Sequence, residues 1–201
     1  MKIAGLMRKR LDRGLTILEI SRQLKIGYRP AYNHISAMEK EKIIKVEIVG
    51  NAKKCTLNLE NAKARHILEE VGILKTEELF KENQKFKIVL ESLIHKLTGR
   101  FISEIHSIIL FGSYAKGSAT KSSDVDLLFI VTDLKGINLR DGIERECASY
   151  HYSHNMKVSP LITDINEFKK MLESKDLNVG REVREYGVPV YGSEMFWRLV
   201  A

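Results

Sequence analysis

The sequence predicts a two-domain protein of the mixed α/β (α+β) class. Its 201 residues are enough for one large domain or two small ones, each with a core of its own. Residues 1–60 show the order helix, turn, helix and hairpin, whereas residues 100–201 alternate short apolar runs of strand length with helical segments. Residues 61–99 have a helical pattern throughout and are predicted to form linker helices between the two domains.

The composition is typical of a soluble globular protein, with 44% hydrophobic and 29% charged residues. The 33 Lys and Arg exceed the 26 Asp and Glu, and the net charge of +7 favours nucleic acid or a nucleotide as partner, although many basic proteins bind neither. Cys55 and Cys147 are isolated, so we interpret both as reduced packing residues. No run approaches the ~18 apolar residues of a membrane span and no apolar leader opens the chain, so we expect a cytoplasmic protein with no membrane partner.

Two helices separated by a turn are predicted near the start of the chain. Residues 14–27 place apolar side chains on one helix face, with Thr16 as the N-cap and Gly27 as the end of the helix. Pro30 can occupy the first position of a second helix, which extends to Glu41.

A hairpin is predicted after these helices, with strands at residues 43–49 and 54–59 around a turn. With the segment ILEISRQLKIGYRPAYNHISAMEKEKII, residues 6–59 resemble the winged helix-turn-helix domains of prokaryotic transcription regulators. The resemblance implies that the second helix and the hairpin bind DNA. The residues then expected to contact DNA are Arg29, Tyr32, Asn33, His34, Lys53 and Lys54. The alternative is a solvated helix face in a domain that mediates dimerisation or protein contact.

The linker region is predicted to contain two helices with a break near residues 72–76. Apolar side chains of the second helix share one side, and we interpret them as packing on the sheet that follows. Their heptad-like spacing would also suit a partner protein or self-association.

Strands and helices alternate after residue 100. Strands are predicted at residues 105–111, 125–131 and 156–162, with a short edge strand at 188–191. Helices are predicted at residues 138–152, 165–173 and 179–186.

The segment IILFGSYAKGSATKSSDVDLLFI carries the clearest chemistry. Gly112 allows the backbone to approach a phosphate closely, and Ser113 offers a hydroxyl and a peptide N–H at a helix N-terminus, where the helix dipole favours anions. Asp124 and Asp126 are two positions apart in a strand, so both carboxylates leave the same face of the sheet. Two converging carboxylates suit a Mg²⁺ ion, which can bridge a triphosphate and activate an attacking hydroxyl.

Gly-Ser followed by Asp-x-Asp, with an apolar strand on each side, resembles the signature of the polymerase beta nucleotidyltransferase superfamily. The short domain and the tail EVREYGVPVYGS are similar to its minimal members in bacteria and archaea. The resemblance implies a small mixed sheet with flanking helices. It also implies Mg²⁺-dependent transfer of a nucleoside monophosphate from an NTP, with ATP the expected substrate, to a hydroxyl acceptor that could be a protein. Members of this kind often pair with helical HEPN-type proteins, so such a partner is expected.

The resemblance also implies roles for individual residues. Asp124 and Asp126 are the predicted catalytic and metal-binding residues. The predicted nucleotide-binding residues are Gly112, Ser113, Lys116 and Ser123. Lys121 is a second cation close to the expected phosphate position.

The strand after Asp-x-Asp departs from the family pattern. Active members usually carry a third carboxylate there, and Ser159 stands at the expected position. Three explanations remain open: catalysis with two aspartates at a reduced rate, substitution by Asp164, Glu144 or Glu146, or a site that binds nucleotide without turnover. The neighbouring cluster SYHYSH is interpreted as a solvated helix end rather than a metal site.

Two functions therefore compete. The first is a nucleotidyltransferase with a DNA-binding domain. The second is a DNA-binding transcription regulator whose nucleotidyltransferase domain is catalytically degenerate and serves as a nucleotide sensor or dimerisation module. The missing third carboxylate favours the second, whereas the retention of Gly112, Ser113 and both aspartates favours the first. A homodimer is expected in either case, since winged-helix regulators are often dimers.

Overall fold

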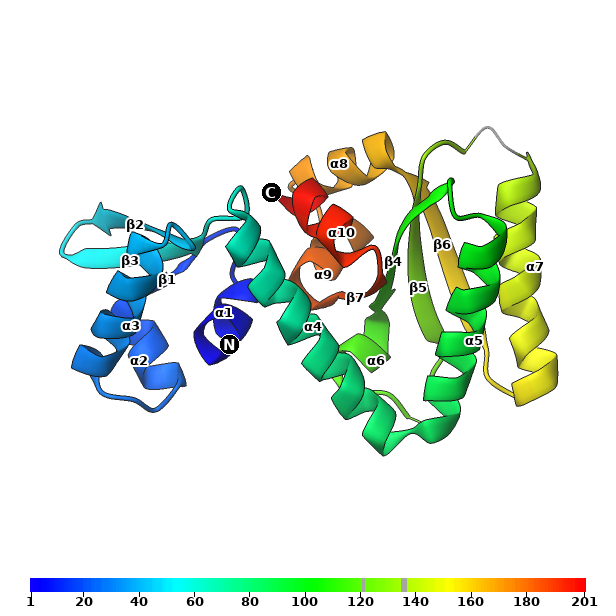
Figure 1. Cartoon of the computed structure of the whole chain (residues 1–201), viewed down its shortest axis with the longest axis horizontal. Helices are drawn as coiled ribbons and strands as arrows, with labels where there is room; N and C mark the ends of the chain where they lie inside the picture. Colours follow the sequence, from blue (N-terminus) through cyan, green and yellow to red (C-terminus); the bar gives the residue numbers. More distant parts are fainter. Residues whose placement is uncertain (121, 135–136) are drawn as a thin grey trace. The chain divides into compact units, whose positions relative to one another are not determined.

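A computed structural model describes residues 1–120, 122–134 and 137–201 and has mixed α/β structure (Figure 1). Lys121, one of the two cations expected near a phosphate, lies outside the described residues. Within the described part of the chain, no helix is both long and apolar enough to cross a lipid bilayer.

The chain forms two compact units. We call Met1–Val71 with Val200–Ala201 the N-terminal unit, and Gly72–Leu199 the C-terminal unit. This division differs from the predicted boundaries at residues 60 and 99. Helix α4 (Ala62–Glu82) contributes residues to both units, and α5 (Gln84–Arg100) contributes to the core of the C-terminal unit rather than to a separate linker.

The N-terminal unit contains the predicted pair of helices and the hairpin, together with a helix and a short strand that the pattern did not predict. Its elements before α4 are α1 (Lys2–Arg8), β1 (Leu15–Thr16), α2 (Ile17–Gln23), α3 (Tyr28–Lys40), β2 (Ile44–Val49) and β3 (Ala52–Leu57). The three strands form an antiparallel sheet in the order β1-β3-β2.

The start of α2 is fixed by the predicted N-cap. The Glu19 N–H donates to Thr16 Oγ1 at 3.2 Å, and the Thr16 N–H donates to Glu19 Oε2 at 2.7 Å, so two unpaired donors at the helix start are satisfied reciprocally. Gly27 is not the end of α2, because that helix ends at Gln23 and Gly27 is the N-cap of α3. Pro30 accordingly lies at the third position of α3, where its lack of an N–H still costs no helix hydrogen bond.

Replacing Thr16 with Ala should lower the free energy of unfolding by about 1 kcal/mol at neutral pH, because the Glu19 N–H loses its acceptor. The same bonds lower the pKa of Glu19, so this contribution is present above the unfolded-state pKa of Glu and is lost as the pH falls through the folded-state pKa. Urea denaturation of the full chain at neutral and acidic pH measures both effects. Thr16→Ser, which retains a hydroxyl, should match the wild type.

Helix α4 passes without interruption through residues 72–76, so the predicted break there is wrong. A single Gly72 costs about 1 kcal/mol in a helix, which is too little to end one of this length. The break lies instead at Asn83, whose side chain accepts from the Phe86 N–H at 3.0 Å and begins α5.

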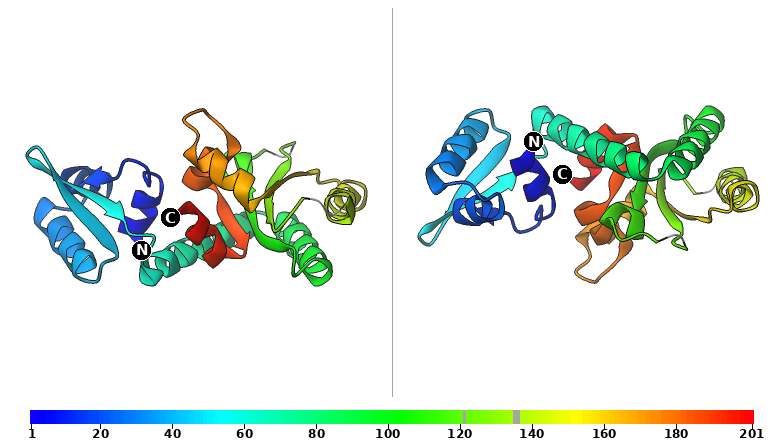
Figure 2. Two further views of the ribbon diagram at one scale, coloured as in Figure 1. Left: turned by 90° about the horizontal axis from the view of Figure 1, so that it is seen from above. Right: turned by 90° about the horizontal axis from the view of Figure 1, so that it is seen from below.

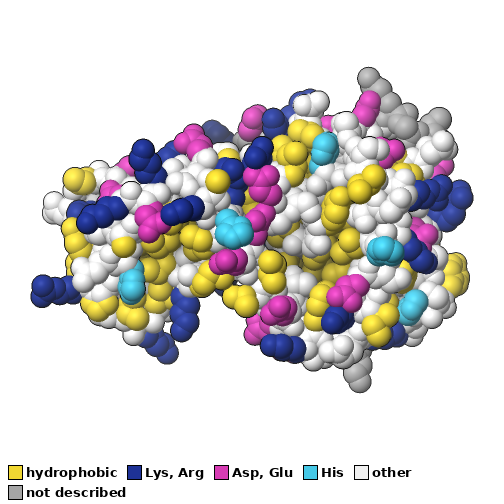
Figure 3. Space-filling model, viewed as in Figure 1, with side chains coloured by type: hydrophobic (Ala, Val, Ile, Leu, Met, Phe, Trp, Pro, Cys, Tyr) yellow, Lys and Arg dark blue, Asp and Glu magenta, His cyan; other side chains and the backbone are white. Residues whose placement is uncertain are grey.

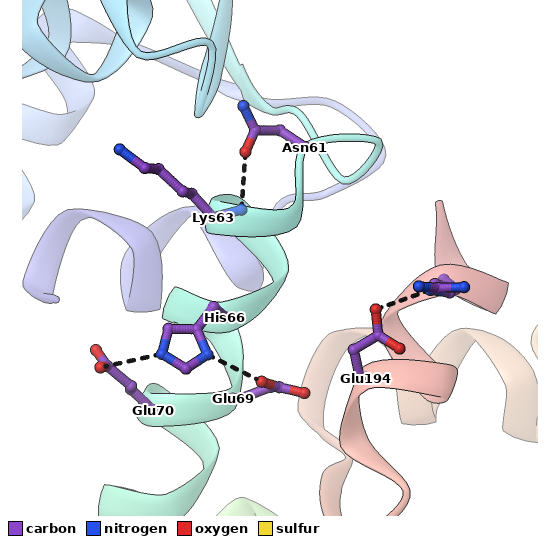
Figure 4. A network of polar contacts seen from close by, with 7 residues as sticks. Asn61, Lys63, His66, Glu69, Glu70 and Glu194 are labelled. Atoms are coloured by element: carbon purple, nitrogen blue, oxygen red, sulfur yellow. Dashed lines mark hydrogen bonds and ion pairs between the residues drawn. The ribbon is translucent and has the colours of Figure 1, made fainter.

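The first turns of α4 carry a group of polar contacts (Figure 4). Asn61 Oδ1 accepts from the Lys63 N–H at 2.8 Å at the start of the helix. The two ring nitrogens of His66 face Glu69 and Glu70, with Nδ1 at 3.3 Å from Glu69 Oε2. These contacts join residues that are close in the sequence, and they stabilise the exposed side of α4.

The C-terminal unit contains a four-stranded mixed sheet in the order β6-β5-β4-β7. The strands are β4 (Ile105–Phe111), β5 (Val125–Val131), β6 (Val158–Asp164) and β7 (Val188–Tyr191). Strands β5 and β6 run parallel, β4 is antiparallel to β5 and β7, and β7 lies at the edge as predicted. Strand β6 is shifted by two residues from the predicted 156–162, because its pairing with β5 continues as far as Val131.

Helices cover both faces of this sheet (Figure 2). They are α6 (Gly112–Lys116), α7 (Ile137–His154), α8 (Ile165–Glu173), α9 (Val179–Tyr186) and α10 (Ser193–Val200), of which the pattern did not predict α10. Apolar side chains of α5 and α7 form one core with the sheet, which confirms that the second linker helix packs on the following sheet. The other face is covered by α8 and α9, and Phe196 of α10 lies against Phe168 of α8 with ring centroids 6.2 Å apart.

Each unit contains one cysteine, and both are buried and free. Burial raises the pKa of Cys55 to about 11 and that of Cys147 to about 12. Both thiols are therefore packing groups, as predicted.

Candidate functional site

Four polar side chains share one face where the parallel strands β5 and β6 begin. Ser159 is the register partner of Asp126, and Val158 is the partner of Val125. Because side chains alternate along a strand, Asp124 and Asp126 lie on the same face as Lys157 and Ser159. Ser159 therefore stands beside the Asp-x-Asp pair, at the position predicted for it.

Asp124 is paired with two side chains from the start of β6. Its Oδ2 accepts a hydrogen bond from Lys157 Nζ at 2.5 Å and another from Ser159 Oγ at 3.2 Å. The bond with Lys157 is the main reason that the pKa of Asp124 lies below its ordinary value, and the same bond raises the pKa of Lys157. Asp124 is thus an ionised carboxylate that already has a cation beside it.

Asp126 has the opposite environment. Its partial burial raises its pKa, and the negative charges of Asp124 and Glu182 raise it further. Two carboxylates that repel each other on one face are suited to a hard divalent cation, which would offset this repulsion. Among the described residues, no three His, Cys, Asp or Glu side chains are grouped closely enough to hold a metal ion. A cation held by Asp124 and Asp126 would therefore take its remaining ligands from substrate and water.

Gly112 connects β4 to α6 in a backbone conformation that only glycine adopts readily, with φ of +66°. A Cβ atom there would overlap Asp126 Oδ2. The prediction explained Gly112 by the approach of a phosphate, and the structure adds a second reason, which is the close approach of the Asp126 carboxylate. Ser113 follows in the first turn of α6, where backbone N–H groups have no helical acceptor.

The short helix α6 is held in place from its apolar side. The Tyr114 ring stacks on Phe86 of α5 with centroids 4.6 Å apart. Gly117 ends α6 in the left-handed region, and its N–H donates to the Tyr114 carbonyl at 3.2 Å. The turn that carries Gly112 and Ser113 is therefore anchored to the core rather than free in solvent.

Lys116 is paired with a residue that the sequence prediction missed. Its Nζ lies 2.7 Å from Glu182 Oε1 on α9, and this contact is the main cause of the raised pKa of Lys116. Glu182 opens the tail segment EVREYGVPVYGS, yet nothing in its local pattern separates it from an exposed helix residue. Only the folding of α9 onto the sheet brings its charge close to Asp126.

The acids considered as substitutes for a third carboxylate are engaged elsewhere. Asp164 caps α8 by accepting from the Glu167 N–H at 2.8 Å, and it pairs with Val131 at the far end of β5. Glu146 forms an ion pair with Lys96 at 2.9 Å, and Glu144 pairs with Arg140 at 3.6 Å. The structure therefore does not support the replacement of the third carboxylate by Asp164, Glu144 or Glu146.

A cavity of about 600 Å³ lies beside Asp124. Its lining includes Asn83, Lys85, Tyr114, Ser123, His151 and Lys157. Ser123 is fixed in the preceding loop because its Oγ accepts from the Thr120 N–H at 2.9 Å. His151, from the SYHYSH cluster, contributes to the cavity wall, so this helix end is more than a solvated surface.

The residues predicted to contact DNA are only partly brought together. Arg29, Tyr32 and Asn33 are exposed on α3, three and four residues apart and thus on one side of the helix. Lys53 of the hairpin joins them, with Nζ 4.8 Å from the centroid of the Tyr32 ring. Figure 3 shows Lys and Arg interspersed with Asp and Glu on the visible face of the molecule.

His34 and Lys54 lie apart from this group. His34 faces a mainly apolar pocket of about 400 Å³ whose lining includes Leu24 and Met38. Lys54 follows Lys53 directly in β3, so its side chain leaves the opposite face of the hairpin.

The sequence matches the nucleotidyltransferase domain family over residues 90–183. Two putative protein adenylyltransferases of Methanocaldococcus jannaschii are similar to it. One is 29% identical over 112 residues, which are 55% of this chain and 74% of the relative, and the other is 31% identical over 87 residues, which are 43% and 80%. A crystal structure of a toxin-antitoxin with AMP-PNP is 21% identical, with a TM-score of 0.38, over 55% of this chain and 82% of that one.

The chain therefore belongs to the nucleotidyltransferase domain family. The matched region contains α6, the Asp-x-Asp pair and Glu182. The nucleotidyltransferase part of the predicted resemblance is thus confirmed.

Proposed function

We propose that the C-terminal unit transfers AMP from ATP to a hydroxyl group of a protein acceptor, with Mg²⁺ as cofactor. The observation that carries this proposal is the placement of Asp124 and Asp126 on one face, directly beside the Gly112-Ser113 turn. Two similar proteins are named putative protein adenylyltransferases, which supports adenylyl transfer and a protein acceptor. A HEPN-type helical protein stays a predicted acceptor.

The chain's own residues bind and orient the reactants. Ser113 donates its N–H and hydroxyl to phosphate oxygens, and Lys116 neutralises further phosphate charge when it leaves Glu182. Asp124 and Asp126 would hold the metal ion, which would supply charge neutralisation at the triphosphate.

In the transfer step, the acceptor oxygen forms a bond to the α-phosphorus. The bond from that phosphorus to the bridging oxygen of the β-phosphate breaks, pyrophosphate leaves, and the hydroxyl proton passes to water. Catalysis then depends mainly on positioning and electrostatic stabilisation, because the protein forms no covalent intermediate.

The test is incubation of the full chain and Mg²⁺ with ATP labelled at either the α- or the γ-phosphate, alone and with a HEPN-type protein. Adenylyl transfer requires that the α-label and not the γ-label becomes attached to protein. Parallel reactions with CTP, GTP and UTP test nucleotide preference. Failure of all four nucleotides to bind would contradict the proposal, whereas binding without transfer would favour the catalytically degenerate regulator.

We also propose that the N-terminal unit is a winged helix-turn-helix domain that binds DNA. The element order from α1 to β3 and the contact of Lys53 with Tyr32 across α3 and the hairpin support this second function. The exposed surface formed by Arg29, Tyr32, Asn33 and Lys53 is the proposed interface.

Replacing Arg29 and Lys53 together with Ala should weaken duplex DNA binding and reduce its salt dependence. Log K for DNA association falls with log salt concentration, and each lost phosphate contact makes this negative slope less steep by about 0.9. Fluorescence anisotropy at several salt concentrations measures this slope. Lys54→Ala removes the same charge from the opposite face of the hairpin and should leave the slope close to that of the wild type. A flat salt dependence of the wild type would contradict DNA binding.

A further inference from the structure

Strand β6 presents a cation and a hydroxyl, rather than a third carboxylate, to the two aspartates. Lys157 and Ser159 both donate to the same oxygen, Asp124 Oδ2. Lys157 also affects Asp126, whose raised pKa is partly offset by the charge of this lysine. One ammonium group therefore acts on both carboxylates.

The backbone of Lys157 is fixed relative to the aspartates. Its carbonyl accepts from the Val125 N–H at 2.8 Å, which ties it to the residue between Asp124 and Asp126. The Lys157 side chain is 62% exposed, so the ammonium can leave Asp124 without disturbing the core. It also lines the 600 Å³ cavity beside Asp124, the space that an acceptor hydroxyl would enter.

The net charge at this face can be compared with that of a site that uses two divalent cations. Sites that transfer nucleotides with two divalent cations use one on the leaving side and one on the attacking side. Two divalent cations against three carboxylates have the same net charge as one divalent cation and one ammonium against two carboxylates. A second divalent cation beside Lys157 would meet a like charge and would lack the carboxylate that Ser159 replaces.

We propose that this site binds a single divalent cation together with the nucleotide, and that the ammonium of Lys157 takes the place of the second cation. This inference rests on the proposed nucleotidyl transfer. Lys157 stabilises charge at the attacking side, and Ser159 orients Asp124 in place of a metal ligand. The presence of Ser159 in place of an acid then goes with a change of the second cation from a metal ion to an ammonium group. It does not mean that the site has lost its function.

The experiment counts Mn²⁺ bound to the full chain by electron paramagnetic resonance, in the presence of a saturating ATP analogue with a methylene group between the α- and β-phosphates. The wild type should bind one Mn²⁺ per chain. The double variant Lys157→Ala/Ser159→Asp should bind two, because the repelling charge is removed and a carboxylate is added.

A second measurement uses Mn²⁺ alone, without nucleotide. Lys157→Met should tighten Mn²⁺ binding by about threefold to fivefold, which corresponds to the loss of one partly exposed competing ion pair. Lys169→Met removes a lysine from α8, away from the site, and should leave the affinity unchanged. This comparison does not depend on the folding of the double variant.

The outcomes separate the inference from the function on which it rests. Two Mn²⁺ ions in the wild type would overturn the inference and leave nucleotidyl transfer intact. A double variant that still binds one ion, or a Lys157→Met affinity equal to that of the wild type, would also overturn it. Absence of bound Mn²⁺ and nucleotide in the wild type would overturn both.

Discussion

Replacing Asp126 with Asn is expected to reduce transfer of the α-label by at least about a hundredfold, as removal of a single charge-stabilising group typically does. Asn keeps the shape of the side chain but loses the charge that would hold the cation. It also removes a partly buried charge, whose burial and repulsion by Asp124 raise the pKa of Asp126, so the folded protein should be no less stable than the wild type. Transfer is measured as labelled protein per unit time, and stability by urea denaturation.

The matched control is Asp164→Asn, which makes the same chemical change at the other end of the sheet. Asn can cap α8 as Asp164 does, so neither transfer nor stability should change appreciably. An Asp126→Asn protein that transfers AMP at the wild-type rate would show that this carboxylate is not part of the catalytic site. Equal losses in both variants would point to a general effect of charge.

Replacing Gly112 with Ala is expected to lower the free energy of unfolding by about 2 kcal/mol and to abolish nucleotide binding. The new Cβ would overlap Asp126 Oδ2, in a backbone conformation that alanine already disfavours. The Asp126 carboxylate must then move away from its position beside Asp124. Urea denaturation and equilibrium binding of ATP measure the two effects separately.

Gly117→Ala separates the steric effect from the backbone effect. Gly117 also has a positive φ, of +74°, but a Cβ there would meet open space. Its substitution should cost only the backbone term of about 1 kcal/mol. Equal losses of stability in the two variants would contradict the explanation by overlap. The double variant Gly112→Ala/Asp126→Ala, which removes the overlapping carboxylate, should recover part of the stability lost in Gly112→Ala.

The strands and most helices could be predicted because their signals are local. Strands β4 and β5 begin and end where the short apolar runs predict, and helices α8 and α9 where the helical pattern predicts. The Asp-x-Asp pair could be predicted for the same reason, since two residues with period-two spacing share a face whatever the rest of the fold. The pattern predicts a break near residues 72–76, but hydrogen bonding through α4 outweighs that weak local preference.

The contacts that define the site could not be predicted, because they depend on how distant elements pack. Lys116 meets Glu182 only because α9 lies beside α6, and the pairing of Asp124 with Lys157 depends on the register between β5 and β6. The orientation of the His34 side chain toward its pocket depends on α1, which lines part of that pocket. Such pairings join residues far apart in the chain, and the local pattern of neither partner indicates the other.

Each unit contains one buried cysteine, which can serve as an internal probe of local unfolding in that unit. Cys55 and Cys147 belong to different units, and each is fully buried with a thiol that stays protonated near neutral pH. An alkylating reagent attacks the thiolate, so it can react with either residue only when the surrounding structure opens. The rate of modification at each cysteine therefore reports the local stability of one unit independently of the other, in the unaltered chain.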